Sequence, residues 1–229
     1  MGTEVSRITV ERAYARWAPF YDLVFGEVFK RARVAAIAAA ERTGGRILEV
    51  GVGTGISLPY YSTANRLVGV DLSEPMLRKA QARVEALGLR QVEGLAVMDA
   101  ERMAFPDGSF DVIVAQLVVT TVPNPEATLD EFVRVLKPGG EIVLVSRVGA
   151  DKGLRLAVEQ SLTPITNLLG WRLEFPWERY ARWVERRDDV CVLEHRAMPP
   201  FGHFSLIRFG KAAGAGAPQE DRLEAQVIG

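Results

Sequence analysis

The chain has 229 residues, enough for one α/β domain with a well-buried core. Its formal net charge is -1 at pH 7, so no strong overall field draws it to nucleic acid, and we expect no nucleic-acid partner. One cysteine and two histidines are too few for an intramolecular disulfide or a dedicated cysteine- or histidine-rich metal centre, and we expect no bound metal.

The first predicted elements are two helices. Residues 5–18 mix apolar and charged side chains as a helix does, and an alanine-rich helix is predicted over residues 26–42. The second helix stops at Gly44-Gly45, a usual helix exit. We assign residues 1–42 to an N-terminal helical lid.

Strands and helices then alternate up to Ser146, which predicts a parallel sheet with helices on both faces. The chain from Leu136 to Gly140 is predicted to be the turn before the fifth strand. The predicted strands cover residues 46–50, 66–71, 92–98, 110–116 and 141–146.

The remaining chain departs from this alternation. Residues 149–187 form a helix-prone insertion, which we expect to bind substrate, and two final strands follow at 190–196 and 204–209. The only cysteine, Cys191, lies in a β-like run and is expected to be a small buried apolar residue. Residues 1–210 are therefore expected to form one domain, and residues 211–229 a disordered tail.

A glycine turn follows the first predicted strand. Gly51, Gly53 and Gly55 allow a tight turn that approaches a ligand without a Cβ in the way. The spacing differs from the G-x-G-x-x-G of dinucleotide folds, because position 56 is Ile56. Glu49 directly before the turn would repel a pyrophosphate but suits a cation, such as the amino-acid end of S-adenosylmethionine (SAM).

Two further carboxylates are predicted at strand ends. Asp71 ends the second strand, where an acid accepts hydrogen bonds from ribose hydroxyls, and Asp99 follows the third strand, where it can bind an adenine amino group. Ligands of open α/β sheets bind beyond the carboxyl ends of the strands. The predicted cofactor-binding residues are Tyr21, Glu49, Gly51, Gly53, Gly55, Asp71, Leu72, Met76, Asp99, Ala100 and Gln116.

The ordered motifs over residues 44–148 resemble class I SAM-dependent methyltransferases. The segment from Tyr14 to Asp22 resembles the Y-x-x-x-A-x-x-Y-D signature of quinone and phospholipid methyltransferases. Together with residues 116–125 and 199–204, it makes the chain similar to soluble bacterial phosphatidylethanolamine N-methyltransferases of the branch near the ubiquinone-biosynthesis C-methyltransferases. The resemblance implies a Rossmann-like, seven-stranded, mostly parallel sheet with an antiparallel last strand.

The same resemblance implies stepwise transfer of methyl groups from SAM to phosphatidylethanolamine, giving phosphatidylcholine and S-adenosylhomocysteine. It also implies peripheral attachment to an anionic membrane. A protonated amine must lose its proton before it can attack, and Tyr14, Tyr21 and His203 are the candidate catalytic residues. The candidate substrate-binding residues are Trp17, Arg147, Lys152, Arg155, Trp171 and Phe201.

The sequence leaves several alternatives open. A helix starting at Pro176 would place Trp177, Tyr180, Ala181 and Val184 on one face, either packed on the sheet or resting at a membrane interface. The enzyme could instead be a C-methyltransferase of a polyprenyl quinol, or a noncatalytic SAM-binding protein. With no predicted spanning helix or signal peptide, we expect a cytoplasmic monomer, peripheral on the cytoplasmic membrane face.

Overall fold

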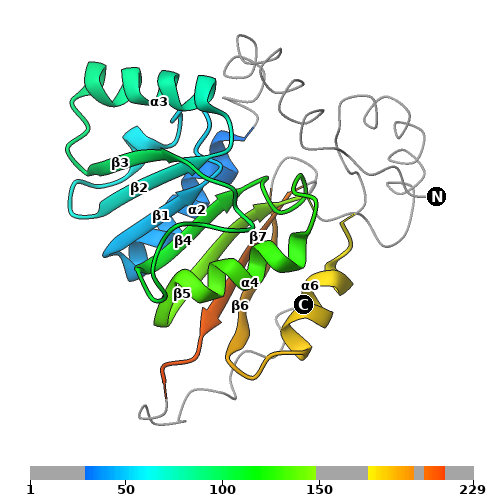
Figure 1. Ribbon diagram of the computed structural model, residues 1–229. Helices are drawn as coiled ribbons and strands as arrows, with labels where there is room; N and C mark the ends of the chain where they lie inside the picture. Colours follow the sequence, from blue (N-terminus) through cyan, green and yellow to red (C-terminus); the bar gives the residue numbers. More distant parts are fainter. Residues whose placement is uncertain (1–28, 148–174, 199–203, 215–229) are drawn as a thin grey trace, which may run out of the picture.

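A seven-stranded sheet forms the centre of the molecule, with strand order β3-β2-β1-β4-β5-β7-β6 (Figure 1). The computed structural model describes residues 29–147, 175–198 and 204–214. Neighbouring strands are parallel except at β7, which is antiparallel to both β5 and β6, as predicted. The strands are β1 (Arg46–Val50), β2 (Arg66–Asp71), β3 (Val92–Val97), β4 (Phe110–Gln116), β5 (Leu136–Ser146), β6 (Val190–Met198) and β7 (Phe204–Lys211).

Helices cover both faces of the sheet, because successive strand residues point to opposite sides. Ile47 packs with α2 on one side, and the adjacent Leu48 packs in a second apolar cluster with α4 and α6. In Figure 1, α2 lies behind the sheet, and α4 and α6 lie in front of it. The helices are α2 (Lys30–Thr43), α3 (Glu74–Leu87), α4 (Pro125–Val135) and α6 (Trp177–Glu185), and a short 3₁₀ helix covers Leu58–Tyr60.

Strand β5 begins earlier than predicted. Leu136 already pairs with Phe110, whereas Glu141 pairs with Val112, so the pairing register shifts between these two points. The stretch that was predicted as a preceding turn is therefore an irregular part of the strand. Gly139, with a φ of 77°, lies in this irregular part.

Cys191 is exposed, contrary to the prediction that it is buried. It lies on β6, the edge strand of the sheet, and belongs to neither apolar cluster. Its Sγ is 3.7 Å from the carbonyl oxygen of Gly210, which has no side chain to cover the thiol. Apolar periodicity could not distinguish this edge position from a central strand.

Helix α6 packs against the sheet through its aromatic side chains. Tyr180 is fully buried and its hydroxyl shares a 2.7 Å hydrogen bond with Ser146 Oγ, while Trp183, which the predicted apolar face omitted, is also buried. Arg179 donates two hydrogen bonds to Glu126 of α4, at 2.9 and 2.7 Å. These contacts favour the packed interpretation of the helix over an aromatic face turned to a membrane.

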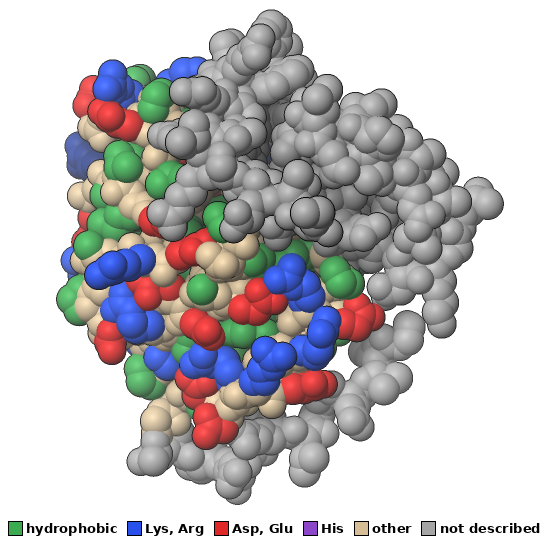
Figure 2. All heavy atoms as spheres, turned by 45° about the vertical axis from the view of Figure 1, so that its right-hand side comes forward, with side chains coloured by type: hydrophobic (Ala, Val, Ile, Leu, Met, Phe, Trp, Pro, Cys, Tyr) green, Lys and Arg blue, Asp and Glu red, His purple; other side chains and the backbone are tan. Residues whose placement is uncertain are grey.

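Basic and acidic side chains alternate over the surface around α4 and α6. Figure 2 shows Lys and Arg intermixed with Asp and Glu on this face. Arg187, for example, pairs with Asp130 of α4 at 2.6 Å and with Asp189 at 2.8 Å. The described part of this face therefore does not form a surface of one charge. None of the described helices is long and apolar enough to span a membrane.

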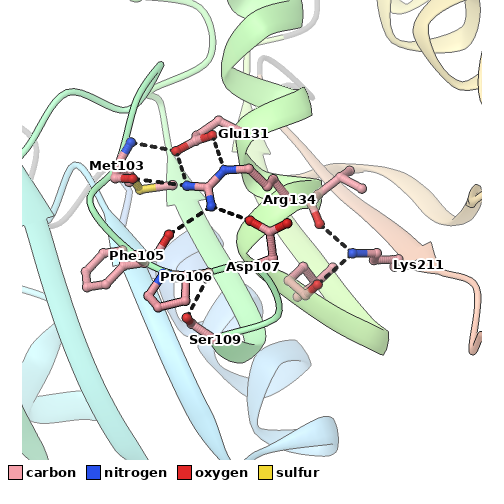
Figure 3. Close-up of polar contacts among 10 residues, drawn as sticks. Met103, Phe105, Pro106, Asp107, Ser109, Glu131, Arg134 and Lys211 are labelled. Atoms are coloured by element: carbon pink, nitrogen blue, oxygen red, sulfur yellow. Dashed lines mark hydrogen bonds and ion pairs between the residues drawn. The ribbon is translucent and has the colours of Figure 1, made fainter.

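Lys211 is the last residue of β7, although the sequence analysis placed it in a disordered tail. Its amine donates to the carbonyl oxygens of Val133 and Leu136 at 2.7 and 2.8 Å, where α4 ends and β5 begins (Figure 3). A cation is stabilised at this negative end of a helix. Of the predicted tail, residues 215–229 lie outside the described residues.

Arg134 fixes the loop between β3 and β4 to α4 (Figure 3). Its guanidinium donates to the carbonyl oxygens of Met103 and Phe105 at 3.0 and 2.8 Å, and to Asp107 at 2.6 Å. It also contacts both oxygens of Glu131, at 2.7 and 2.8 Å. One side chain thus holds three points of the loop.

Replacing Arg134 by Met is expected to destabilise the protein by about 1–3 kcal/mol, because the loop carbonyls and Glu131 lose their charged donor. Urea unfolding measures this loss. Arg102→Met, at an exposed position of the same loop, is the matched control. Equal midpoints for the two variants would contradict an anchoring role for Arg134.

Candidate functional site

A cavity of about 220 Å³ lies at the carboxyl ends of the parallel strands. It has the predicted position, since strand ends of one direction meet at one edge of the sheet. Most of its wall is apolar, and the predicted acids Glu49, Asp71 and Asp99 all line it. The other predicted cofactor-binding residues in the wall are Gly51, Gly53, Leu72, Met76, Ala100 and Gln116.

The three turn glycines have different structural roles. All have positive φ values, 70° at Gly51, 56° at Gly53 and 72° at Gly55, which favour glycine. A Cβ at Gly51 would collide with Val118, and one at Gly55 would meet Leu58 and Ala80. A Cβ at Gly53 would meet nothing within 4 Å. Gly53 therefore lines the cavity beside open space, whereas Gly55, which does not line the described cavity wall, allows close packing of the turn.

Asp71 connects the glycine turn to the start of α3. Its Oδ2 accepts a hydrogen bond from Gly53 N and its Oδ1 one from Ser73 N, both at 2.8 Å. Burial raises the pKa of Asp71, although these backbone donors act in the opposite direction. Each carboxylate oxygen can accept a further hydrogen bond, so Asp71 remains available to a ligand hydroxyl.

Glu49 is a buried acid with an incomplete set of partners. Its Oε1 accepts from Ser57 Oγ at 2.6 Å and from Gln116 Nε2 at 3.2 Å. Its Oε2 is buried and has no hydrogen-bond partner among the described residues. Burial raises the pKa of Glu49 to about 7, although Ser57, Tyr61, Arg33 and Gln116 each lower it. A hydrogen-bond donor or cation in the cavity would complete this acceptor.

The wall beyond β4 contains residues that the sequence analysis did not assign to the site: Leu117, Val118, Thr121, Val122 and Pro123. Leu117 has a φ of 63°, a conformation that a branched aliphatic residue rarely adopts. Its N–H donates to Val145 O at 2.7 Å, which helps to hold this conformation. No sequence motif marks such a position, because leucine is not a turn residue.

Arg33, Ser57 and Ser73 are polar residues of the wall that the sequence analysis also missed. Ser57 follows the glycine turn and bonds to Glu49, and Ser73 precedes the first residue of α3. The hydroxyl of Ser73 is buried without a hydrogen-bond partner among the described residues. Arg33 is only 7% exposed although it belongs to an alanine-rich helix. The sequence feature that could have identified Arg33 is a cationic residue on the apolar face of a predicted helix.

The predicted substrate-binding and catalytic residues are mostly not described. Arg147 follows β5, and its guanidinium lies 5.8 Å from the ring centre of Phe204, outside the described cavity wall. The others lie outside the described residues: Tyr14, Trp17, Tyr21, Lys152, Arg155, Trp171, Phe201 and His203. The structure thus brings together the predicted cofactor-binding residues at the strand ends. The roles of the predicted substrate-binding and catalytic residues stay predictions.

Comparison with known proteins gives matches over most of the chain. Residues 48–144 match a family model described as a methyltransferase domain. The chain is 44% identical over 200 residues to a phosphatidylethanolamine N-methyltransferase of Cereibacter sphaeroides, covering 87% of this chain and 96% of that protein. It is 28% identical over 197 residues to a ubiquinone/menaquinone biosynthesis C-methyltransferase of Cupriavidus taiwanensis, covering 81% and 80% of the two chains.

Solved structures show the same fold at low sequence identity. A chain from the complex between the Haloferax volcanii Trm112 methyltransferase activator and a putative methyltransferase matches with a TM-score of 0.72 and 18% identity, covering 91% of this chain and all (100%) of that one. A SAM-dependent methyltransferase of Thermotoga maritima, described as a possible histamine N-methyltransferase, matches with a TM-score of 0.64 and 22% identity, covering 87% and 99%.

Proposed function

The chain belongs to the SAM-dependent methyltransferase family of the Cereibacter sphaeroides phosphatidylethanolamine N-methyltransferase, and we propose that it methylates the amine of phosphatidylethanolamine stepwise to phosphatidylcholine. This family is the one that the sequence motifs predicted. The observation that carries the proposal is 44% identity over almost the whole length of both proteins. Relatives named for quinone methylation are less similar, at 34% identity over 148 residues and 28% over 197 residues.

The residues of the cavity fit SAM as the methyl donor. Glu49 Oε2 and Ser73 Oγ are buried acceptor and donor atoms without partners among the described residues, and both residues line the cavity. The open space at Gly53 lets a ligand approach the backbone. When bound, SAM supplies a methyl group already activated on a sulfonium. We therefore infer that Glu49 binds the amino-acid end, Asp71 the ribose and Asp99 the adenine, with S-adenosylhomocysteine as product.

The chain's part in the chemistry is alignment of the amine and removal of its proton. A lipid ammonium has a pKa near 10 by analogy with lysine, and an apolar, water-excluding pocket lowers it. Tyr14, Tyr21 and His203 are the proposed proton acceptors, directly or through water. Loss of turnover in Tyr14→Phe with unchanged SAM affinity would support this role for Tyr14, and unchanged turnover would contradict it.

The substrate side is proposed from residue chemistry. Arg147, Lys152 and Arg155 would bind the lipid phosphate, and the aromatic rings of Trp17, Trp171 and Phe201 would face the methylated ammonium. To reach the lipid headgroup, the protein must attach peripherally to the cytoplasmic face of the membrane. We propose that it does so as a monomer. Because the face around α4 and α6 has mixed charge, we expect the attachment to involve residues 1–28, where Arg7, Arg12 and Arg16 lie among aromatic residues.

The test is an assay with isotopically labelled SAM and two separate substrates, phosphatidylethanolamine vesicles and a polyprenyl quinol. We expect label in mono-, di- and trimethylated phospholipid, separated by thin-layer chromatography, and none in the quinol. Label only in the quinol would establish the C-methyltransferase alternative, and label in neither would favour a noncatalytic SAM-binding protein. Flotation of the same vesicles, with and without anionic lipid, measures the attachment.

A further inference from the structure

Helix α2 carries a buried cation into the wall of the cavity. Arg33 lies between Ala32 and Ala36, which pack against the sheet, and it is only 7% exposed. Phe29, one turn earlier, lines the same cavity. Arg33 lines the cavity, and a guanidinium at a cavity wall can donate two parallel hydrogen bonds to an anion bound there.

The same cavity is also lined by an acid, Glu49 of β1. Glu49 is 2% exposed and keeps one oxygen without a partner among the described residues. Glu49 and Arg33 line the same cavity, and the charge of Arg33 lowers the pKa of Glu49. The effect of Arg33 on the pKa of Glu49 is smaller than the effect of burial, so that the pKa is still about 7. The cavity thus has an acidic acceptor on β1 and a guanidinium on α2.

A ligand that matches both groups must carry a cation and an anion a short distance apart. An amino-acid zwitterion has this pattern, and a guanidinium binds a carboxylate through two parallel hydrogen bonds. A phosphate would also suit Arg33, but it would stand beside the carboxylate of Glu49 and be repelled by it.

We propose that Arg33 binds the carboxylate of the amino-acid end of SAM while Glu49 binds its ammonium. The proposal rests on the proposed use of this cavity for SAM and adds the residue that recognises the cofactor's anionic group. It also explains why an alanine-rich helix keeps a long cationic side chain on its buried face.

Calorimetric titration with three ligands tests the assignment. SAM carries both groups, decarboxylated SAM lacks the carboxylate, and 5′-methylthioadenosine lacks the whole amino-acid part. Arg33→Met should weaken SAM at least tenfold, the loss of a charged hydrogen bond, and leave the affinities of the other two ligands unchanged. The SAM affinity of Arg33→Lys should lie between those of the wild type and Arg33→Met. Arg31→Met, at an exposed position of α2, should bind all three ligands as the wild type does.

Two results would overturn the proposal. Equal weakening of SAM and 5′-methylthioadenosine in Arg33→Met would mean that Arg33 only supports the fold of the cavity. Unchanged SAM affinity with a raised KM for phospholipid would mean that Arg33 binds the lipid phosphate. If Arg33→Met does not fold, Arg33→Lys gives the same comparison with the charge retained. A wild-type protein that binds SAM but methylates no phospholipid would contradict the proposed function and leave the expected ligand pattern as support for Arg33.

Discussion

Replacing Asp71 by Ala is expected to weaken SAM binding on the order of 100-fold. Two ribose hydroxyls would lose a charged acceptor, at a cost of about 1.5–3 kcal/mol in total, which corresponds to roughly 10- to 150-fold in affinity. The backbone N–H groups of Gly53 and Ser73, now 2.8 Å from this carboxylate, would lose their partner as well. The glycine turn and the start of α3 would then no longer be held in one arrangement.

Titration calorimetry of the purified variants measures this effect, with thermal unfolding as a check on the fold. Asp71→Asn keeps one oxygen acceptor and should show an intermediate affinity. Asp188→Ala removes an exposed acid away from the cavity and should bind SAM as the wild type does. Wild-type affinity in Asp71→Ala would remove Asp71 from the cofactor site.

The sheet and the acids at its edge could be predicted from sequence because the responsible signals are local. Apolar runs identified the strands, and a parallel sheet brings their carboxyl ends together, so Glu49, Asp71 and Asp99 were expected in one place. The antiparallel pairing of β7 came from family resemblance instead. Periodicity alone does not give the direction of a strand.

Other features depend on contacts between distant segments and left no local signal. The sequence predicts Lys211 as the start of a polar tail, yet its amine donates hydrogen bonds to the carbonyl oxygens of Val133 and Leu136. Gly55 fits a ligand-binding motif, but the reason for a glycine there is that a Cβ would meet Leu58 and Ala80. Arg33 belongs to no sequence motif, and only the structure shows that it lines the same cavity as Glu49.

Glu49 gives the second large expected effect, and it concerns pH. The unfolded chain loses the Glu49 proton near 4.5 and the folded protein without ligand near 7. Between these values the folded state holds more protons, so its stability should fall as pH rises, by about 3 kcal/mol in total. Glu49→Gln cannot ionise and should lack this contribution. Above pH 7 the unliganded variant should therefore be more stable than the wild type.

The same substitution should weaken SAM binding, because the cofactor ammonium would lose its carboxylate. Wild-type affinity should rise with pH up to about 7, as Glu49 ionises, and fall again as the cofactor amine loses its proton near pH 8. Glu49→Gln should lack the rise below pH 7. Urea unfolding without ligand and SAM titration, both from pH 5 to 8, measure the two effects.

If Glu49→Gln is more stable without ligand but binds SAM more weakly, the carboxylate of Glu49 serves ligand binding and destabilises the unliganded fold. The physical reason is that burial penalises the charged form of Glu49 and that its Oε2 has no hydrogen-bond partner among the described residues. Gln116→Leu is the matched comparison, because it removes one hydrogen bond to Oε1 and leaves the charge of Glu49 in place. If Glu49→Gln instead destabilised the unliganded protein at pH 8, the carboxylate would be stabilising the fold, and its assignment to the cofactor ammonium would lose its main support.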